Sequence, residues 1–369
     1  MALFPDLFVI TDPGQLPKGD VDDEDTLAIA NLLIRLNILD VLGVVANMAP
    51  ATQRAMLAKG TLKILGQGHI PVGRGSACMQ PDDDGIDYRY SVGYLARRDE
   101  VRNGNRLILK TLREAKPKGV VLLLISGLTD AAYILRKHRD LFVNRVRRLV
   151  IMGGVVAEGD MPKLDADGRI VPDNANNHTF DMEAAKYLYR EAQDAGIGIT
   201  VLTRHAAGAC KVPRAIYDDM AATGHPVGIR LRDTQKFAIE HLWQRACAAP
   251  GDKAARKGLP PDRDRAWFSK AFCGGEGMDR NVNDSIWDLV KTFMLYDPAT
   301  LVAAIPNLRE HYYAPHIVEY RGAEHMIIGV SPTYHNVRDG AELSKFMHTA
   351  LVESLRESTT VLQGIRRAG

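Results

Sequence analysis

Five continuous apolar runs, separated by segments with helical spacing, limit the folds open to this chain more than any other feature of its sequence. The runs are rich in Val, Ile and Leu and do not alternate with polar residues, which is typical of parallel strands covered on both faces. They occupy residues 7–10, 41–46, 119–125, 148–154 and 196–202. Helical patterns such as DTLAIANLLIRL and DMEAAKYLYREAQDA lie between the runs. The sequence therefore predicts an α/β fold with a doubly wound, mostly parallel sheet flanked by helices.

Charge, cysteine content and hydropathy exclude several classes of function. The 47 Lys and Arg residues nearly balance the 45 Asp and Glu residues and form no concentrated basic tract, so nucleic acid and membrane surfaces are not expected partners. The four cysteines lie far apart and form no C-x-x-C pair, which argues against a zinc or redox motif. No apolar run approaches the ~20 residues that a spanning helix needs. We expect a cytoplasmic protein that binds a small molecule.

The segment 226–282 differs in texture from the rest of the chain. Two aromatic helical pieces flank a stretch rich in Lys, Asp, Gly and Pro. We interpret residues 1–369 as a single domain and 226–282 as a helical insertion within it. The insertion is either a lid over the ligand site or a surface excursion, and the sequence leaves both interpretations open.

An acidic stretch stands where the first predicted strand passes into the first predicted helix. The sequence VITDPGQLPKGDVDDEDTLAIANLL, from Val9 to Leu33, contains six carboxylates. One or two of them would cap the helix, whose amino end favours negative charge. Six crowded carboxylates repel one another unless a cation neutralises them or several face solvent. Because the cluster has no Cys and no nearby His, its oxygen ligands favour Ca²⁺ or Mg²⁺ over zinc; a solvated acidic loop is the alternative.

Other polar residues also follow directly after the apolar runs. In doubly wound sheets, ligands bind beyond the carboxyl ends of the strands. Asp12, Asn47, the segment 126–130 and the pair Gly153-Gly154 all occupy such positions. We therefore expect them to converge at one edge of the sheet.

Six motifs, taken in order, resemble the inosine-uridine preferring nucleoside hydrolase family. They are TDPG followed by DVDDEDTLAIANLL, then LGVVAN, SGLTDAA, IMGG, NNHTFDMEAA and YDPATLVAA, and together they span most of the chain. The resemblance implies a nucleoside-hydrolase-like fold and Ca²⁺-dependent hydrolysis of the N-glycosidic bond of a ribonucleoside or related ribosyl compound. It also implies a small-molecule nucleoside substrate, release of base and ribose, and a homodimer or homotetramer.

The resemblance also implies a ligand set for Ca²⁺. Asp12, Asp23, the backbone carbonyl of Thr129 and Asp297 would hold the ion, and Asp12 would act as general base. The spacer QLPKGDV after Asp-Pro-Gly is longer than the usual family spacer. Asp22-Asp23 is the literal acidic pair, and the segment 24–25, Glu-Asp, remains a shifted alternative.

Ribose contacts follow from the same resemblance. Asp22, Asn47 and Asn177 would bind the ribose hydroxyls. Ala175 stands where the family usually has a ribose-contacting glutamate, and Asn174 or Asn176 would compensate for its loss.

The groups that would serve the departing base differ from the family pattern. Many members have His-Asp-Pro where this chain has Tyr296-Asp297-Pro298. Tyrosine, with a reference pKa near 10, is a poorer acid at neutral pH than imidazolium. His178 and His241 are the nearest histidines that we nominate as alternative acids. Five aromatic residues could stack on a base: Tyr88, Tyr90, Trp243, Trp267 and Trp287.

These departures leave three hypotheses. The first is an active Ca²⁺-dependent nucleosidase that uses Asp12 and Tyr296 at its catalytic centre. The second is a catalytically weak or inactive binding protein that keeps the metal and ribose contacts. The third is a Mg²⁺-dependent phosphohydrolase, which is disfavoured because no basic residue in these motifs is placed to neutralise a phosphate.

Overall fold

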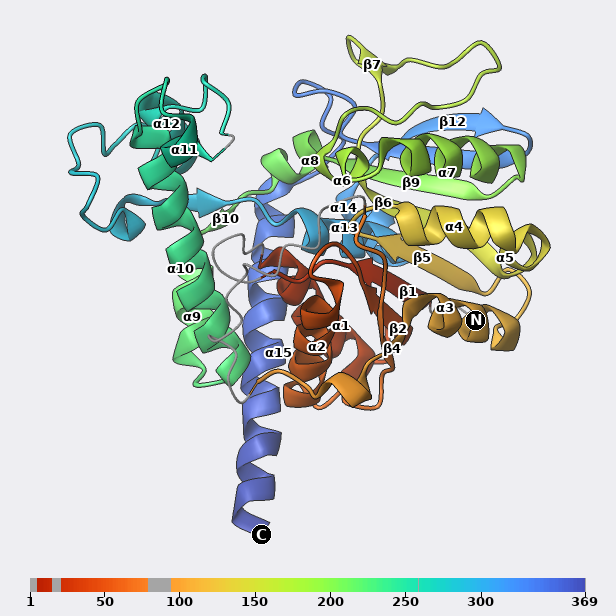
Figure 1. The fold of residues 1–369 in the computed structure, drawn as a ribbon, viewed down its shortest axis with the longest axis horizontal. Helices are drawn as coiled ribbons and strands as arrows, with labels where there is room; N and C mark the ends of the chain where they lie inside the picture. The colour runs from red at the N-terminus through yellow and green to blue at the C-terminus, as the bar shows by residue number, and fades with distance from the viewer. Residues whose placement is uncertain (1–4, 15–20, 79–93, 258, 369) are drawn as a thin grey trace.

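A computed structural model describes residues 5–14, 21–78, 94–257 and 259–368, with side chains as far as Arg356. A nine-stranded sheet runs through the centre of the molecule in the order β12-β13-β9-β6-β5-β1-β2-β3-β4 (Figure 1). All neighbours in it are parallel except the edge pair β12 and β13. The strands are β1 (Asp6–Thr11), β2 (Asp40–Ala46), β3 (Val72–Arg74), β4 (Arg102–Asn103), β5 (Val120–Leu124), β6 (Val146–Gly153), β9 (Gly198–Thr203), β12 (His316–Tyr320) and β13 (Ala323–Ile328).

The chain adds strands first on one side of β1 and then on the other. Strands β2, β3 and β4 lie on one side, and β5, β6, β9 and β13 lie on the other. This doubly wound, mostly parallel arrangement confirms the predicted fold class. The topological switch point lies between β1 and β5, where open α/β sheets usually bind ligands.

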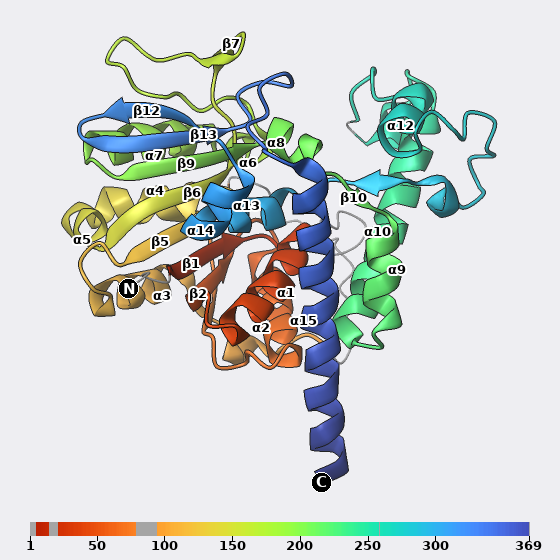
Figure 2. The same ribbon diagram turned by 180° about the vertical axis from the view of Figure 1, so that it is seen from behind.

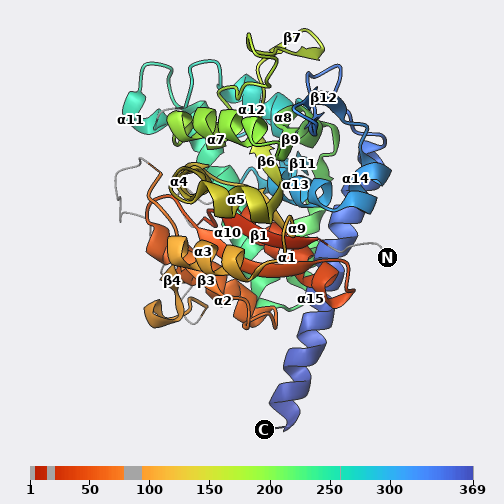
Figure 3. The same cartoon turned by 90° about the vertical axis from the view of Figure 1, so that its right-hand side faces the viewer.

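Both faces of the sheet are buried, as the unbroken apolar runs predict. Along β1, Leu7 and Val9 pack into one core while Phe8 and Ile10 pack into the other. The first core is completed by α1 (Asp22–Arg35), α2 (Ala51–Ile64), α9 (Ala215–Ala222), α10 (Pro226–Cys247), α13 (Tyr296–Ala304) and α15 (Gly340–Ala368). The second core is completed by α3 (Gly104–Glu114), α4 (Thr129–Lys137), α5 (Arg139–Arg145) and α7 (Met182–Asp194). Figure 3 shows the helices on the two faces of the sheet.

Shorter elements gather around the carboxyl ends of the strands. The hairpin formed by β7 (Ala157–Glu158) and β8 (Met161–Pro162) follows β6, and α6 (Asn176–Thr179) and α8 (Arg204–Ala209) lie nearby (Figure 1). The other elements are β10 (Val212–Pro213), β11 (Thr292–Phe293), α11 (Lys253–Arg256), α12 (Arg265–Phe272), α14 (Pro306–Tyr312) and the 3₁₀ turns at Arg98–Glu100 and Trp287–Leu289.

The segment 226–282 forms α10, α11 and α12, with α12 packed against α10. The rings of Trp243 and Phe268 pack in a tilted arrangement, at 5.1 Å between ring centroids, and both residues belong to the first core. The insertion therefore shares a core with the rest of the described chain.

The last helix, α15, packs against α1 and then projects beyond the body of the molecule (Figure 2). No helix in the described part of the chain is long and apolar enough to cross a membrane.

Candidate metal and ligand site

A cavity of about 710 Å³ opens beyond the carboxyl ends of five adjacent strands. Each strand contributes a residue at or just after its end: Asp12 for β1, Ile125 for β5, Gly153 for β6, Thr203 for β9 and Gly329 for β13. The cavity therefore lies across the switch point, where the sequence predicts a ligand site.

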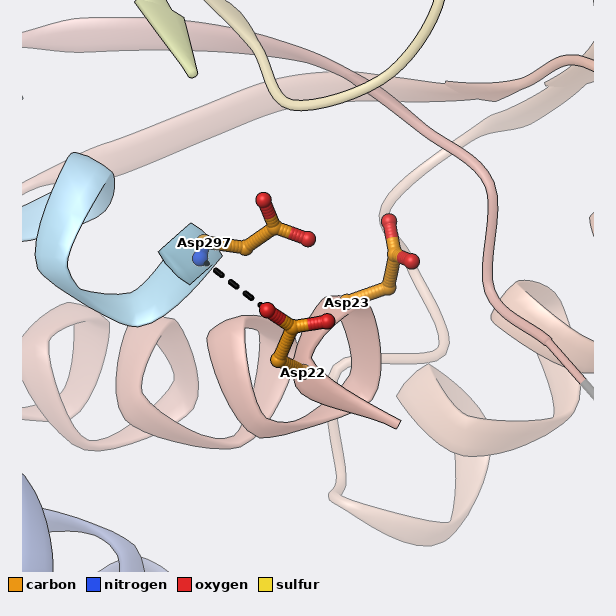
Figure 4. Close-up of side chains that lie close together, drawn as sticks. All are labelled: Asp22, Asp23 and Asp297. Atoms are coloured by element: carbon orange, nitrogen blue, oxygen red, sulfur yellow. Dashed lines mark hydrogen bonds between the residues drawn. The ribbon is translucent and has the colours of Figure 1, made fainter. Parts of the chain in front are cut away.

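Three aspartates from two helices face a common space in this cavity (Figure 4). Asp22 and Asp23 open α1, Asp297 lies in the first turn of α13, and each side chain is at most 5% exposed. Each offers a carboxylate oxygen, and these three oxygens lie within 4.8 Å of one another. Two unit charges at that separation repel by about 3 kcal/mol at an effective dielectric constant of 20. A hard divalent cation fits this oxygen-only set and removes the repulsion.

Hydrogen bonds fix the orientation of the two aspartates on α1. Asp23 Oδ1 accepts the backbone N–H of Asp12 at 2.8 Å and the hydroxyl of Thr11, so it is tied to the end of β1. Asp22 Oδ2 accepts the backbone N–H groups of Tyr296 at 3.1 Å and Asp297 at 3.3 Å. Asp22 thus joins the amino end of α1 to the amino end of α13. The two helices and β1 together set the geometry of the cluster.

The next two acidic residues of α1 face other partners. Glu24 is fully buried, forms an ion pair with Arg230 of α10 and accepts the Thr61 hydroxyl at 2.6 Å. Asp25 accepts the hydroxyl of Tyr217 at 3.1 Å. Neither residue lines the cavity. Of the two acidic pairs that the sequence leaves open, Asp22-Asp23 is therefore the one at the cavity.

Two buried arginines hold the turn that follows β1. Arg54 of α2 donates to the carbonyls of Asp12 at 2.5 Å and Pro13 at 3.1 Å. Arg230 donates to the carbonyl of Gly14 at 3.1 Å. No local sequence pattern links α2 or α10 to the Asp-Pro-Gly turn, so these positioning residues could not be predicted from the sequence.

Several predicted substrate residues line the same cavity. Asn176, Asn177 and Tyr296 are on its wall, together with Ala175. Asn177 Nδ2 donates to the carbonyl of Met152 at 3.1 Å, which leaves its side-chain oxygen as an acceptor for a ligand hydroxyl. Their roles toward a substrate stay predictions.

Asn47 and Thr129 do not line the cavity. The fully buried Asn47 amide donates to the Gly127 carbonyl at 2.9 Å and to Asp130 at 3.0 Å, and it accepts the Ser126 hydroxyl at 2.5 Å. These bonds hold the end of β2 against the loop after β5. The predicted ribose contact of Asn47 has no support in this placement.

The Thr129 hydroxyl donates to Asp181 at 2.9 Å. None of residues 126–130 lines the cavity; the residue just before them, Ile125, does, and it directly follows β5. Thr129 as a carbonyl ligand stays a prediction, and Ile125 is the backbone position that the cavity itself indicates.

The histidines and aromatic residues nominated from the sequence lie away from the cavity wall, where they are described. His178 is fully buried, with Nδ1 at 3.0 Å from the Asp173 carbonyl and Nε2 at 3.3 Å from the Tyr189 hydroxyl. His241 stacks on Phe237 of the same helix, at 4.8 Å between ring centroids. Trp243 and Trp287 are buried in the first core, and Trp267 packs against it. Tyr88 and Tyr90 lie outside the described residues.

Among the described residues, His205 is the histidine that lines the cavity, and Arg204 precedes it there. Neither residue is among the site residues nominated from the sequence. The position of His205 in the sequence could have indicated a site residue, because the segment TRHA directly follows the apolar run 196–202. Burial and the charge of Arg204 lower the pKa of His205, while Asp173 acts in the opposite direction. The described residues of the 226–282 insertion contribute nothing to the wall, so its lid role stays a prediction.

The doubly wound sheet and the cavity across its switch point place this chain among the α/β proteins whose ligand site lies beyond the carboxyl ends of the strands. A family model described as inosine-uridine preferring nucleoside hydrolase matches residues 11–338. The chain belongs to this family.

Several solved structures are similar to this chain in fold. The type III effector protein XopQ, complexed with adenosine diphosphate ribose, is 32% identical with a TM-score of 0.80, and the match covers 96% of this chain and 95% of that one. The effector protein XOO4466 is 30% identical with a TM-score of 0.77 over the same shares. A purine-preferring ribonucleoside hydrolase from Gardnerella vaginalis shares the fold at 12% identity and a TM-score of 0.56, over 95% of this chain and 99% of that one. The comparison with curated proteins found no match.

Proposed function

We propose that this protein hydrolyses the N-glycosidic bond of a ribonucleoside or related ribosyl compound in a Ca²⁺-dependent reaction that releases base and ribose. The observation that carries the proposal is the buried group of Asp22, Asp23 and Asp297 beside Asp12 in one cavity of a nucleoside hydrolase family member. The family resemblance and the oxygen-only donor set support Ca²⁺ as the cation. A homodimer or homotetramer and a cytoplasmic location stay predictions.

Asp12, Asp23 and Asp297 would hold the ion, with Asp22 within reach and a backbone carbonyl at Ile125 or Thr129 completing the set. When bound, the ion supplies positive charge that acidifies a water and orients the ribose diol. Asp12 is only partly buried, and its backbone is fixed by Arg54 and Asp23. Its carboxylate accepts the proton of the attacking water.

We assign ribose binding to the two asparagines on the cavity wall. The side-chain oxygens of Asn177 and Asn176 accept ribose hydroxyls, while Asp22 binds the diol from the opposite side. Holding the sugar in one orientation lowers the barrier by about several kcal/mol, because the water is then already aligned with the anomeric carbon that develops oxocarbenium character as the base departs. Tyr296 is the described aromatic residue on the wall, and its hydroxyl lies 3.4 Å from Met294 Sδ. It assists departure of the base by hydrogen bonding.

A second candidate is a binding protein that has kept the metal and ribose contacts but has little turnover. Tyr296 in place of histidine and Ala175 in place of glutamate favour it. The XopQ complex with adenosine diphosphate ribose, at 32% identity, also supports a ribosyl ligand that extends beyond a nucleoside.

The test is release of the free base, measured by chromatography, from purine, pyrimidine and modified nucleosides, from a nucleoside monophosphate and from adenosine diphosphate ribose. A reducing-sugar assay follows ribose release from the unphosphorylated nucleosides in parallel. Each substrate is tested with Ca²⁺ and with chelator, on the wild type, Asp12→Ala and the control Asp140→Ala, whose exposed carboxylate lies on α5. Chelator-sensitive release that only Asp12→Ala loses supports hydrolysis. Ca²⁺-dependent binding by calorimetry without release supports the binding protein. Release of inorganic phosphate from the nucleoside monophosphate, without free base from any substrate, would overturn both.

A further inference from the structure

One part of the cavity wall carries two side chains that suit an anion. Arg204 and His205 open α8 directly after β9, and both line the cavity. Within the described chain, neither side chain forms a hydrogen bond. Arg204 forms a long ion pair with Asp173, at 3.8 Å between Nη1 and Oδ2, which is beyond hydrogen-bond distance. The guanidinium therefore keeps its donors for a ligand, although a counter-charge stands close by.

Asp173 is held by its own chain. Its Oδ1 accepts the backbone N–H of Ala175 at 2.8 Å, and His178 Nδ1 lies 3.6 Å from the same oxygen. These contacts fix Asp173 against α6, so that it does not turn fully toward Arg204. Ala175 also stands where the family pattern leads us to expect a glutamate. An anion near Arg204 therefore meets one fewer carboxylate than the family pattern would place there.

The distance from the acidic cluster sets the size of the ligand. In the sheet, β9 is three positions from β1, because β6 and β5 lie between them. Three strand spacings of ~4.8 Å amount to about 14 Å between the strand ends that present Asp12 and Arg204. Side chains extend into this gap from both ends, but a ribose ring held at the acidic cluster is too small to fill it. A ribose that carries a further substituent would reach from the acidic cluster to Arg204.

We propose that Arg204 and His205 form a phosphate subsite that selects ribosyl compounds carrying a phosphate on the ribose over unphosphorylated nucleosides. The planar guanidinium donates two parallel N–H bonds to phosphate oxygens, and the imidazole adds a third donor. The acidic cluster binds the sugar, and Arg204 and His205 at the start of α8 bind its phosphate. This inference rests on the ribose site of the proposed function.

Calorimetry with ribose 5-phosphate and ribose, both in Ca²⁺, tests the subsite without requiring turnover. The variants are Arg204→Met, His205→Gln and the control Arg113→Met, which removes an exposed arginine of α3. Charge-assisted hydrogen bonds of this kind correspond to about a tenfold or larger change in affinity. We expect the wild type and Arg113→Met to bind ribose 5-phosphate at least about tenfold more tightly than ribose. Arg204→Met loses most of that preference and binds ribose as before, and His205→Gln loses part of it.

Three results would overturn the subsite: equal affinity of the wild type for the two ligands, an unchanged preference in Arg204→Met, or equal weakening of both ligands in that variant. Circular dichroism and the Ca²⁺-induced rise in melting temperature check that each variant is folded. If ribose binds and phosphate adds nothing, the subsite alone fails. If neither ligand binds in the presence of Ca²⁺, the ribose site of the proposed function fails with it.

Discussion

Replacing Arg230 with methionine tests whether the acidic stretch is held by distant buried partners. Arg230 is 5% exposed and pairs with Glu24, which is fully buried. The same guanidinium donates to the carbonyl of Gly14 at 3.1 Å. Within the described part of the chain, Arg230→Met leaves the Thr61 hydroxyl as the side-chain hydrogen-bond donor to the Glu24 carboxylate, and it removes the Arg230 donor from the Gly14 carbonyl.

The expected loss of stability is about 4–6 kcal/mol. Removing one partner of a buried ion pair costs about 3–5 kcal/mol, because an uncompensated charge remains inside the protein. The lost hydrogen bond to Gly14 adds about 1 kcal/mol. In the double variant Glu24→Gln/Arg230→Met no buried charge is left, so the loss falls to about 1–3 kcal/mol.

Urea unfolding, followed by circular dichroism in the presence of Ca²⁺, measures both losses. The double-mutant comparison isolates the charge from the packing of the longer side chain. If Arg230→Met and the double variant lose the same stability, the ion pair does not hold Glu24 and the reasoning is wrong. A loss below about 1 kcal/mol in the single variant would show that Glu24 reaches water or another partner once Arg230 is gone.

Three further changes have defined outcomes. Asp23→Asn should abolish the rise in melting temperature that Ca²⁺ causes, whereas Asp25→Asn, which does not line the cavity, keeps that rise even if its baseline is lower. Burial lowers the pKa of His225 and of His325 to about 4, so the unfolded chain binds protons that the native one does not as the pH falls from 6.5 toward 4. The free energy of unfolding measured in urea should therefore be lower at pH 4.5 than at pH 7 by roughly 2–3 kcal/mol for each of these histidines. In His225→Asn the contribution of one histidine to this pH-dependent loss should disappear. Asp160→Ala removes the acceptor of two hydroxyls that tether the β7–β8 hairpin to the segment after β13, so limited proteolysis should cut the hairpin faster while global stability changes by less than about 0.5 kcal/mol.

The central strands could be predicted because their environment is uniform. A strand buried on both faces needs apolar side chains at every position, and β1, β5, β6 and β9 show this as unbroken runs. Strands β3 and β4 span only three and two residues, too few to produce a pattern. In the antiparallel pair of β12 and β13, buried residues are interspersed with exposed ones. The two strands are joined at Arg321 and Gly322, whose positive φ angles of 48° and 74° suit a tight hairpin turn. A search for continuous apolar runs does not detect that pattern.

The location of the site could be predicted from the sequence, but not which of the residues at the strand ends face the cavity. The rule that ligands bind at strand ends led to Asp12 and the family resemblance led to Asp23, and both residues line the cavity. The same rule does not distinguish a strand-end residue that faces the cavity from one that bonds beneath it, and Asn47 is of the second kind. It also applied to Arg204 and His205, which follow β9, yet no motif of the resemblance included them.

The four consecutive acidic residues of α1 connect the stability of the fold to the site. Each carboxylate meets a different element: α13 for Asp22, β1 for Asp23, α10 for Glu24 and α9 for Asp25. Two of these contacts join residues 206 and 192 positions apart in the chain, so the cluster forms only when distant segments have assembled. A cation bound between Asp22, Asp23 and Asp297 would then stabilise the assembled state alone, by an amount that grows with the logarithm of its concentration above the dissociation constant. Ca²⁺ should therefore raise the melting temperature whether or not the protein turns over a substrate, and stability, more directly than activity, reports whether the cation site exists.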